Sequence, residues 1–294
     1  MTQPTTITQA TTHTLDVPGS TLTYDVRESA DADAPVLMVI GSPMAASGFV
    51  TLGSHFPDRT IVTYDPRGSE RSVKADPTGR STPEKHADDI HAVISAVGRG
   101  SVDLFATSGG AINALALVAG QPGDVRLLVA HEPPLASILP DREAAYAATE
   151  DIAASYQRDG LGPAMAKFIM LVMHEGDVPA DFASMPVDPA MFGLPTEDDG
   201  NRTDPVVGSH IITATHYEPD FEAIRAGHAR IVVAIGEESG RTLARRGGEA
   251  VAERLGVAPV TFPGGHDGFL GGEYGHAGKP DEFAAKLREV LAQG

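Results

Sequence analysis

The hydrophobic positions along the chain follow two different periods, and their alternation predicts an α/β architecture. Short apolar runs of strand length occur at 36–40, 60–64, 102–106, 125–130, 230–235 and 259–262. Apolar positions with helical spacing occur between and after them, at 45–56, 83–97, 111–120, 241–255 and 281–291. Alternating residues on either side of Pro18-Gly19-Ser20 predict a β-hairpin before the first run. Strands that alternate with helices imply a mostly parallel sheet covered on both faces.

One serine stands at the junction between a predicted strand and a predicted helix. The strand at 102–106 runs into Thr107-Ser108-Gly109-Gly110, and Ala106 and Gly110 flank the serine two positions away on either side. A turn this tight holds its serine in a strained conformation that only small neighbours allow. The hydroxyl then stands clear of the sheet. The alternatives are a phosphate loop, for which both glycine-rich motifs are missing, and a simple helix cap.

The pattern small-x-Ser-x-small resembles the nucleophile elbow of the α/β-hydrolases, with alanine where the commonest form has glycine. The order of the elements resembles that family over nearly the whole chain: a hairpin, strand-helix repeats, the elbow, an insertion and two closing strand-helix units. The resemblance implies an α/β-hydrolase fold with a mostly parallel central sheet. It also implies a core formed by 1–134 and 226–294, with 135–225 inserted as a helical cap or lid.

The resemblance also implies a general base, because a serine hydroxyl is a weak nucleophile until a neighbour takes its proton. In the family the catalytic histidine lies on the loop after the last strand. That loop is glycine-rich here and reads Phe262-Pro263-Gly264-Gly265-His266-Asp267-Gly268. We therefore expect His266 to be the base. His276 is a weaker candidate because it lies further from the strand end.

Two glutamates are candidates for the acid that orients this histidine. Many family members carry an aspartate in a G-x-x-D pattern after the second-last strand. In this chain 236–239 reads Gly-Glu-Glu-Ser, which puts serine at that position and Glu238 one residue before it. Haloalkane dehalogenases and some lactonases place the acid after the strand that follows the elbow, and Glu132 matches that position. We expect Glu132, with Glu238 as the second choice.

The resemblance further implies two backbone amides that bind a developing oxyanion. One belongs to Gly109, the residue after the serine. The other belongs to Ser42, because Ile40-Gly41-Ser42-Pro43 resembles the family's H-G-x-P loop without its histidine. The stretch 65–72 resembles the family's D-x-R-G-x-G-x-S turn, and we interpret Arg67 there as scaffold.

Composition restricts the partners and the chemistry. Forty acidic against 22 basic residues give a formal net charge of −18, which repels nucleic acid and anionic membrane surfaces. The absence of cysteine excludes disulfides, thiolate metal sites and cysteine nucleophiles. We expect no metal and no cofactor, since no H-E-x-x-H motif occurs. The polar N-terminus has no secretory signal pattern, so we expect a cytoplasmic location.

Together these residues predict a cofactor-free serine hydrolase that cleaves a small carboxylic ester or lactone. Ser108 is the expected nucleophile, His266 the base and Glu132 the orienting acid, with the amides of Ser42 and Gly109 binding the oxyanion. Two alternatives stay open. In the first, the same triad catalyses another reaction, namely perhydrolysis, C–C hydrolysis or cofactor-free oxygenation. In the second, the protein has the hydrolase fold but only binds a small ligand without catalysis. The sequence gives no indication of the oligomeric state.

Overall fold

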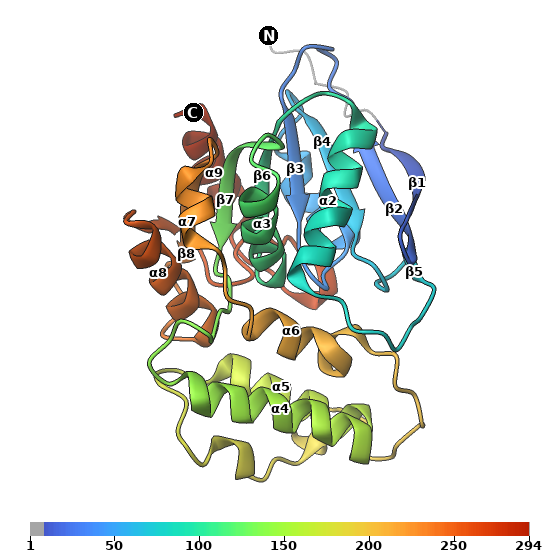
Figure 1. The fold of residues 1–294 in the computed structure, drawn as a ribbon, viewed down its shortest axis with the longest axis vertical. Coiled ribbons are helices and arrows are strands. Elements are labelled where there is room, and N and C mark those ends of the chain that lie inside the picture. Colours follow the sequence, from blue (N-terminus) through green and yellow to red (C-terminus); the bar gives the residue numbers. More distant parts are fainter. Residues whose placement is uncertain (1–8, 294) are drawn as a thin grey trace.

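The computed structural model describes residues 9–293, and a nine-stranded sheet forms its centre (Figure 1). Eight strands follow the order β1-β2-β4-β3-β6-β7-β8-β9, and β5 pairs with β2 beside this path. Strand β2 runs antiparallel to β1, β4 and β5, whereas the pairs from β4 through β9 are parallel. The strands are β1 (Thr11–Val17), β2 (Ser20–Arg27), β3 (Val36–Ile40), β4 (Thr60–Asp65), β5 (Val73–Lys74), β6 (Val102–Thr107), β7 (Val125–His131), β8 (Arg230–Gly236) and β9 (Val260–Phe262).

Helices cover both faces of this sheet, as the sequence predicts. Helices α2, α3 and α8 pack on one face, and α1 and α9 pack on the other. The α-helices are α1 (Val50–Ser54), α2 (Pro83–Val97), α3 (Gly109–Gly120), α4 (Arg142–Asp159), α5 (Leu161–Met173), α6 (Ile211–Thr215), α7 (Phe221–Ala226), α8 (Leu243–Leu255) and α9 (Pro280–Ala292). The predicted α/β architecture with a mostly parallel sheet is therefore confirmed.

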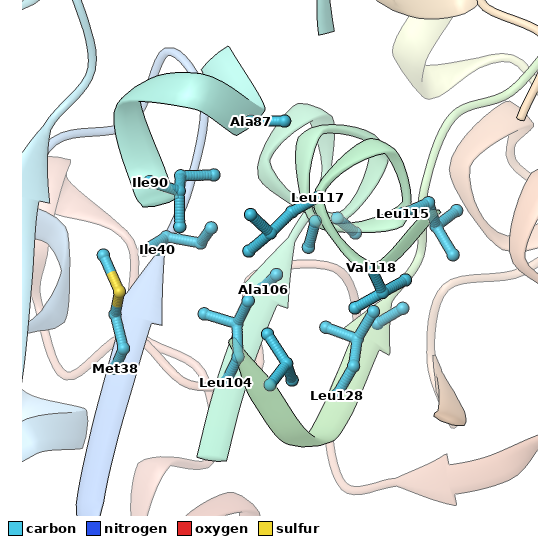
Figure 2. Close-up of a cluster of buried hydrophobic side chains, with 14 of the residues drawn as sticks. Met38, Ile40, Ala87, Ile90, Leu104, Ala106, Leu115, Leu117, Val118 and Leu128 are labelled. Atoms are coloured by element: carbon cyan, nitrogen blue, oxygen red, sulfur yellow. The ribbon is translucent and has the colours of Figure 1, made fainter. Parts of the chain in front are cut away.

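The continuous apolar run of β3 shows why the strands can be recognised in the sequence. All five residues of β3 are buried. Met38 and Ile40 join the core under α2 and α3, whereas Leu37 and Val39 join the core on the opposite face. This alternation follows from the two-residue period of a strand. Figure 2 shows the first of these cores, where side chains from β3, β6 and β7 meet those of α2 and α3.

The residues between β7 and β8 form an inserted segment, and most of it, including α4, α5 and α6, lies beyond one end of the sheet (Figure 1). Its helices α4 and α5 pack on each other around a second hydrophobic core, which includes Ile152, Tyr156 and Leu171 and is completed by Leu243 of α8. A π-helical turn, η4 (Val206–His210), leads directly into α6. Helix α7 instead contributes Ile224 to the core of the sheet. The division at 135 and 225 into core and lid stays a prediction.

One predicted helix differs from the structure. The helix expected at 45–56 consists of a 3-10 turn, η1 (Ala46–Phe49), followed by the short helix α1. The break falls at Phe49, whose φ of −117° and ψ of 12° are not helical. Gly48 and Gly53 lie on either side of the break, and glycine weakens a helix by about 1 kcal/mol relative to alanine. No helix within residues 9–293 has the length and apolar character needed to cross a membrane.

Candidate active site

Ser108 occupies a strained turn between β6 and α3. Its φ of 55° and ψ of −130° lie outside the backbone regions that residues other than glycine normally adopt. The helix begins directly after it and packs closely on the loop after β3. A Cβ atom added to Gly110 would lie 2.8 Å from the Cα of Gly41, so only glycine fits at this position. A residue in such a conformation persists only if the surrounding structure holds it in place, and residues of this kind cluster at functional sites.

Glu132 and His266 are joined by a hydrogen bond between β7 and the loop after β9. The Nδ1 atom of His266 lies 2.7 Å from Oε2 of Glu132. The other carboxylate oxygen accepts a hydrogen bond of 2.8 Å from the amide of Gly236. The Glu132 side chain is fully buried, whereas the His266 side chain is 35% exposed. The acid is thus fixed in the interior, and the ring that it holds remains open on one side.

The backbone at Glu132 is strained as well. Its φ is 47°, a left-handed conformation that is uncommon for a residue other than glycine. Its amide donates to the carbonyl of Ala234 at 3.0 Å, which continues the ladder between β7 and β8. Ser108 and Glu132 therefore stand at the carboxyl ends of two neighbouring parallel strands, each in a conformation that the fold must enforce.

The negative charge of Glu132 and a positive charge on His266 stabilise each other. Burial alone raises the pKa of Glu132. The hydrogen bond with His266, the nearby imidazoles and the amide of Gly236 outweigh burial and lower this pKa to about 2. Burial lowers the pKa of His266, but the hydrogen bond and charge of Glu132, with a smaller effect from Asp267, raise that pKa above its usual value. The carboxylate is ionised at neutral pH and stabilises a proton on the imidazole.

Ser108 is linked to this pair through its backbone. Its amide donates to the carbonyl of His131 at 2.9 Å, and His131 directly precedes Glu132. Within residues 9–293 the hydroxyl of Ser108 forms no hydrogen bond with His266. Hydrogen bonds between a nucleophile and its base commonly tighten only in the complex with substrate. The structure thus brings the predicted acid and base into contact, with the predicted nucleophile one strand away.

His131 is a second imidazole under the candidate site that the sequence analysis did not assign. Its ring stacks on that of His266 with centroids 5.8 Å apart, and its Nδ1 lies 2.9 Å from the hydroxyl of Thr107. Phe105 and Phe283 surround it on the core side. Burial lowers the pKa of His131 to about 4, so the ring is neutral at pH 7. The only feature of the sequence that could have pointed to His131 is its position directly before Glu132 at the end of β7.

The other acid and histidine candidates lie on the surface. Glu238 forms an ion pair of 2.5 Å with Lys279, and 55% of its side chain is exposed. It makes no hydrogen bond with His266, whose Nδ1 is occupied by Glu132. His276 is 64% exposed and faces Asp267 at 3.5 Å. The geometry favours Glu132 over Glu238 as the partner of His266.

The two predicted oxyanion residues are close neighbours, and a third residue reaches them from the inserted segment. A Cβ atom added to Gly109 would lie 2.5 Å from the carbonyl oxygen of Ser42 and would also collide with the ring of His210. Nε2 of His210 lies 3.1 Å from the same carbonyl. His210 ends the π-helical turn η4, and such turns are frequent at functional sites. The sequence analysis assigned no function to His210, which falls within the predicted lid.

Arg67, in the turn at 65–72, makes the kind of contacts that a scaffold residue makes. Arg67 makes two hydrogen bonds, of 2.6 and 2.5 Å, to the carboxylate of Asp89 on α2, and both side chains are buried. Asp65 is fully buried and accepts hydrogen bonds from Arg71 and from the amide of Ala46. The turn is therefore fastened both to α2 and to the loop after β3. Within residues 9–293 no group of three or more histidine, aspartate or glutamate side chains is arranged to hold a metal ion.

Comparison with known proteins agrees with this architecture. No protein-family model matches the chain. The uncharacterized hydrolase YraK of Bacillus subtilis (strain 168) is 27% identical over 283 residues, which are 95% of either chain. A thermophilic esterase from Thermogutta terrifontis has a TM-score of 0.66 at 20% identity and covers 97% of this chain and 98% of its own. The enol-lactonase from Burkholderia xenovorans LB400 has a TM-score of 0.66 at 17% identity and covers 95% of this chain and 100% of its own.

Other matching structures are described as alpha/beta hydrolases, among them one from Sphaerobacter thermophilus DSM 20745. The chain has the α/β-hydrolase fold. Its sheet, its elbow and the insertion after β7 occur in the order that the sequence resemblance implied.

Proposed function

We propose that the protein is a serine hydrolase that cleaves a small carboxylic ester or lactone. The observation that carries the proposal is the hydrogen bond of 2.7 Å between the buried carboxylate of Glu132 and the ring of His266, at the strand end next to the strained Ser108. A serine, a histidine and an orienting acid perform nucleophilic acyl transfer in unrelated folds, and the contact between acid and histidine is present here. Two of the solved structures that share its fold are described as an esterase and an enol-lactonase, which is consistent with this substrate class.

The first half of the reaction forms an acyl-enzyme. The hydroxyl oxygen of Ser108 attacks the carbonyl carbon while Nε2 of His266 takes its proton. Glu132 accepts the hydrogen bond from Nδ1–H, which keeps Nε2 free to act as the base and stabilises the imidazolium that forms. The amides of Gly109 and Ser42 donate to the oxyanion. Donors of this kind contribute about 3 kcal/mol each to the stability of the transition state.

The second half of the reaction releases the acyl group. When the tetrahedral intermediate collapses, the imidazolium gives its proton to the leaving oxygen, and the bond between that oxygen and the acyl carbon breaks. Water then attacks the ester of Ser108, again with His266 as the base, and the acid is released with the serine restored. In a lactone the leaving oxygen stays attached, so the product is a single hydroxy acid.

A substrate panel tests this function. We expect the purified protein to hydrolyse p-nitrophenyl esters of graded acyl length or lactones with five- and six-membered rings, measured by absorbance or pH-stat. A fluorophosphonate probe should label it. Failure of every substrate together with absence of labelling would indicate a binder of small ligands. A rate that depends on added hydrogen peroxide would indicate perhydrolysis.

The pH profile should reflect the contact between His266 and Glu132. A protonated imidazole cannot accept the serine proton, so kcat/KM must fall as the pH drops through the pKa of His266. Because Glu132 raises this pKa above 6.5, we expect the midpoint of the rising limb above pH 6.5. Glu132 itself, with a pKa of about 2, should add no transition between pH 4 and 9. A midpoint below 6.5 would contradict the assigned pairing.

A further inference from the structure

A polar cavity adjoins the candidate active site on the side of the loop after β3. Its volume is about 340 Å³, within the range of small-ligand pockets. The 65–72 turn, the region around β5 and the start of α2 form one wall, and residues 202–210 of the inserted segment form the other. Ser42 and His210 line the cavity, and both approach Gly109. Ser108 is not among the lining residues, so the cavity lies beside the reacting centre.

Three polar atoms of the lining residues are buried without any hydrogen-bond partner. They are the hydroxyls of Ser42 and Ser69 and the Nδ1 atom of His86. These residues are only 4%, 6% and 3% exposed. An unsatisfied buried polar group costs about 1–3 kcal/mol, so a wall with three of them is suited to a ligand that supplies the missing partners. The hydroxyls can donate, and burial keeps the pKa of His86 well below its usual value, so its ring is neutral.

Two of the three lysine and arginine side chains that line the cavity are paired with carboxylates. Arg67 is neutralised by Asp89, and Arg202 is neutralised by Asp198 at 2.6 Å. Lys74 also lines the cavity, yet its ammonium forms no ion pair within residues 9–293 and donates only to the carbonyl of Gly79.

One carboxylate lines the cavity, that of Asp204. It accepts hydrogen bonds from the amides of Val206 and Val207 at the start of η4. Its charge is therefore partly satisfied by the inserted segment itself. Among residues 9–293 the ammonium of Lys74 has no carboxylate within ion-pair distance. Asp76, an exposed acid outside the lining, acts on it only at longer range.

We propose that this cavity binds a carboxylate carried by the substrate, with Lys74 as its counterion and the hydroxyls of Ser42 and Ser69 as donors. The proposal rests on the proposed function and narrows its substrates to half-esters, or lactones that bear a free carboxylate. The ester or lactone carbonyl lies at Ser108, and the carboxylate lies beyond Ser42. Lys74 is then a specificity-determining residue that takes no part in the covalent steps.

The test compares two substrates that differ only in charge. Monoethyl glutarate carries the carboxylate, and ethyl glutaramate replaces it with a neutral amide of the same shape. We expect the wild type to show a KM about 10- to 100-fold lower for the half-ester, the range of a charge-assisted hydrogen bond. Lys74→Met should remove this preference by raising the KM for the half-ester. Lys286→Met removes a cation on α9 that lies outside the cavity and pairs with Glu289, so it is the matched control and should keep the preference.

Equal KM values for both substrates in the wild type would overturn the proposal, and so would an equal effect of Lys74→Met on both. A binding experiment separates this proposal from the proposed function. Glutarate is titrated into the Ser108→Ala variant by calorimetry, and then into the same variant with Lys74→Met added. Binding that Lys74→Met abolishes supports the carboxylate site even if no ester is hydrolysed. Absence of binding to the Ser108→Ala variant overturns it even if neutral esters are good substrates.

Discussion

Ser108→Ala is expected to lower kcat for p-nitrophenyl acetate by about 10⁴-fold or more, because the acyl-enzyme can no longer form. The residual rate should come from the oxyanion amides and substrate binding alone. Fluorophosphonate labelling should disappear completely. Alanine at a φ of 55° is strained as serine is, so the free energy of unfolding should change little. Initial rates, gel fluorescence and urea unfolding measure these three quantities.

A matched serine at the other end of β6 provides the control. Ser101 is exposed just before the strand begins, and Ser101→Ala should leave both hydrolysis and labelling intact. Labelling that persists in Ser108→Ala would assign the nucleophile to a different residue and contradict the proposed function. Loss of labelling in both variants would point to misfolding, which the unfolding curves would reveal.

Glu132→Gln should have the second largest effect, a fall in kcat of about 10²- to 10⁴-fold with a smaller change in KM. The amide is nearly the same size as the carboxylate, but it carries no charge to stabilise the imidazolium and favours the wrong tautomer of His266. It also leaves a fully buried side chain with altered hydrogen bonds to Gly236. Steady-state kinetics on p-nitrophenyl acetate measure the loss.

Glu238→Gln is the control that distinguishes the two candidate acids. Glu238 is largely exposed and pairs with Lys279, and surface ion pairs of this kind contribute about 0–1 kcal/mol. We expect its activity and stability to match the wild type. If Glu238→Gln loses activity while Glu132→Gln keeps it, the assignment of the acid is wrong.

The central fold could be predicted from the sequence because its signals are local. The run 36–40 is apolar throughout since both faces of β3 are covered, and the alternation of such runs with helical patterns fixes the α/β class. The elbow is equally local, because Ala106, Ser108 and Gly110 lie within five residues. The break at Phe49 was missed because the periodicity of 45–56 is helical on both sides of it.

The acid could not be settled from the sequence. Glu132 and Glu238 both follow strands of one parallel sheet, whose carboxyl ends meet at the same edge. The structure distinguishes them through the left-handed bend at Glu132, which turns its carboxylate beneath His266, and through Lys279, which pairs with Glu238. His210 is 168 positions from Ser42, and no short motif signals a contact between residues so far apart.

The reach of His210 to the carbonyl of Ser42 limits how this protein can be re-engineered. Exchanging the residues between β7 and α7 for those of a relative is a natural route to new specificity, since most of their hydrophobic core is formed within this stretch. If the exchanged segment lacked a histidine at position 210, the carbonyl of Ser42 would lose its hydrogen-bond donor, and the loop that carries the Ser42 amide would be held less firmly. A chimera that keeps the sheet of this protein should therefore also keep His210 within the exchanged segment.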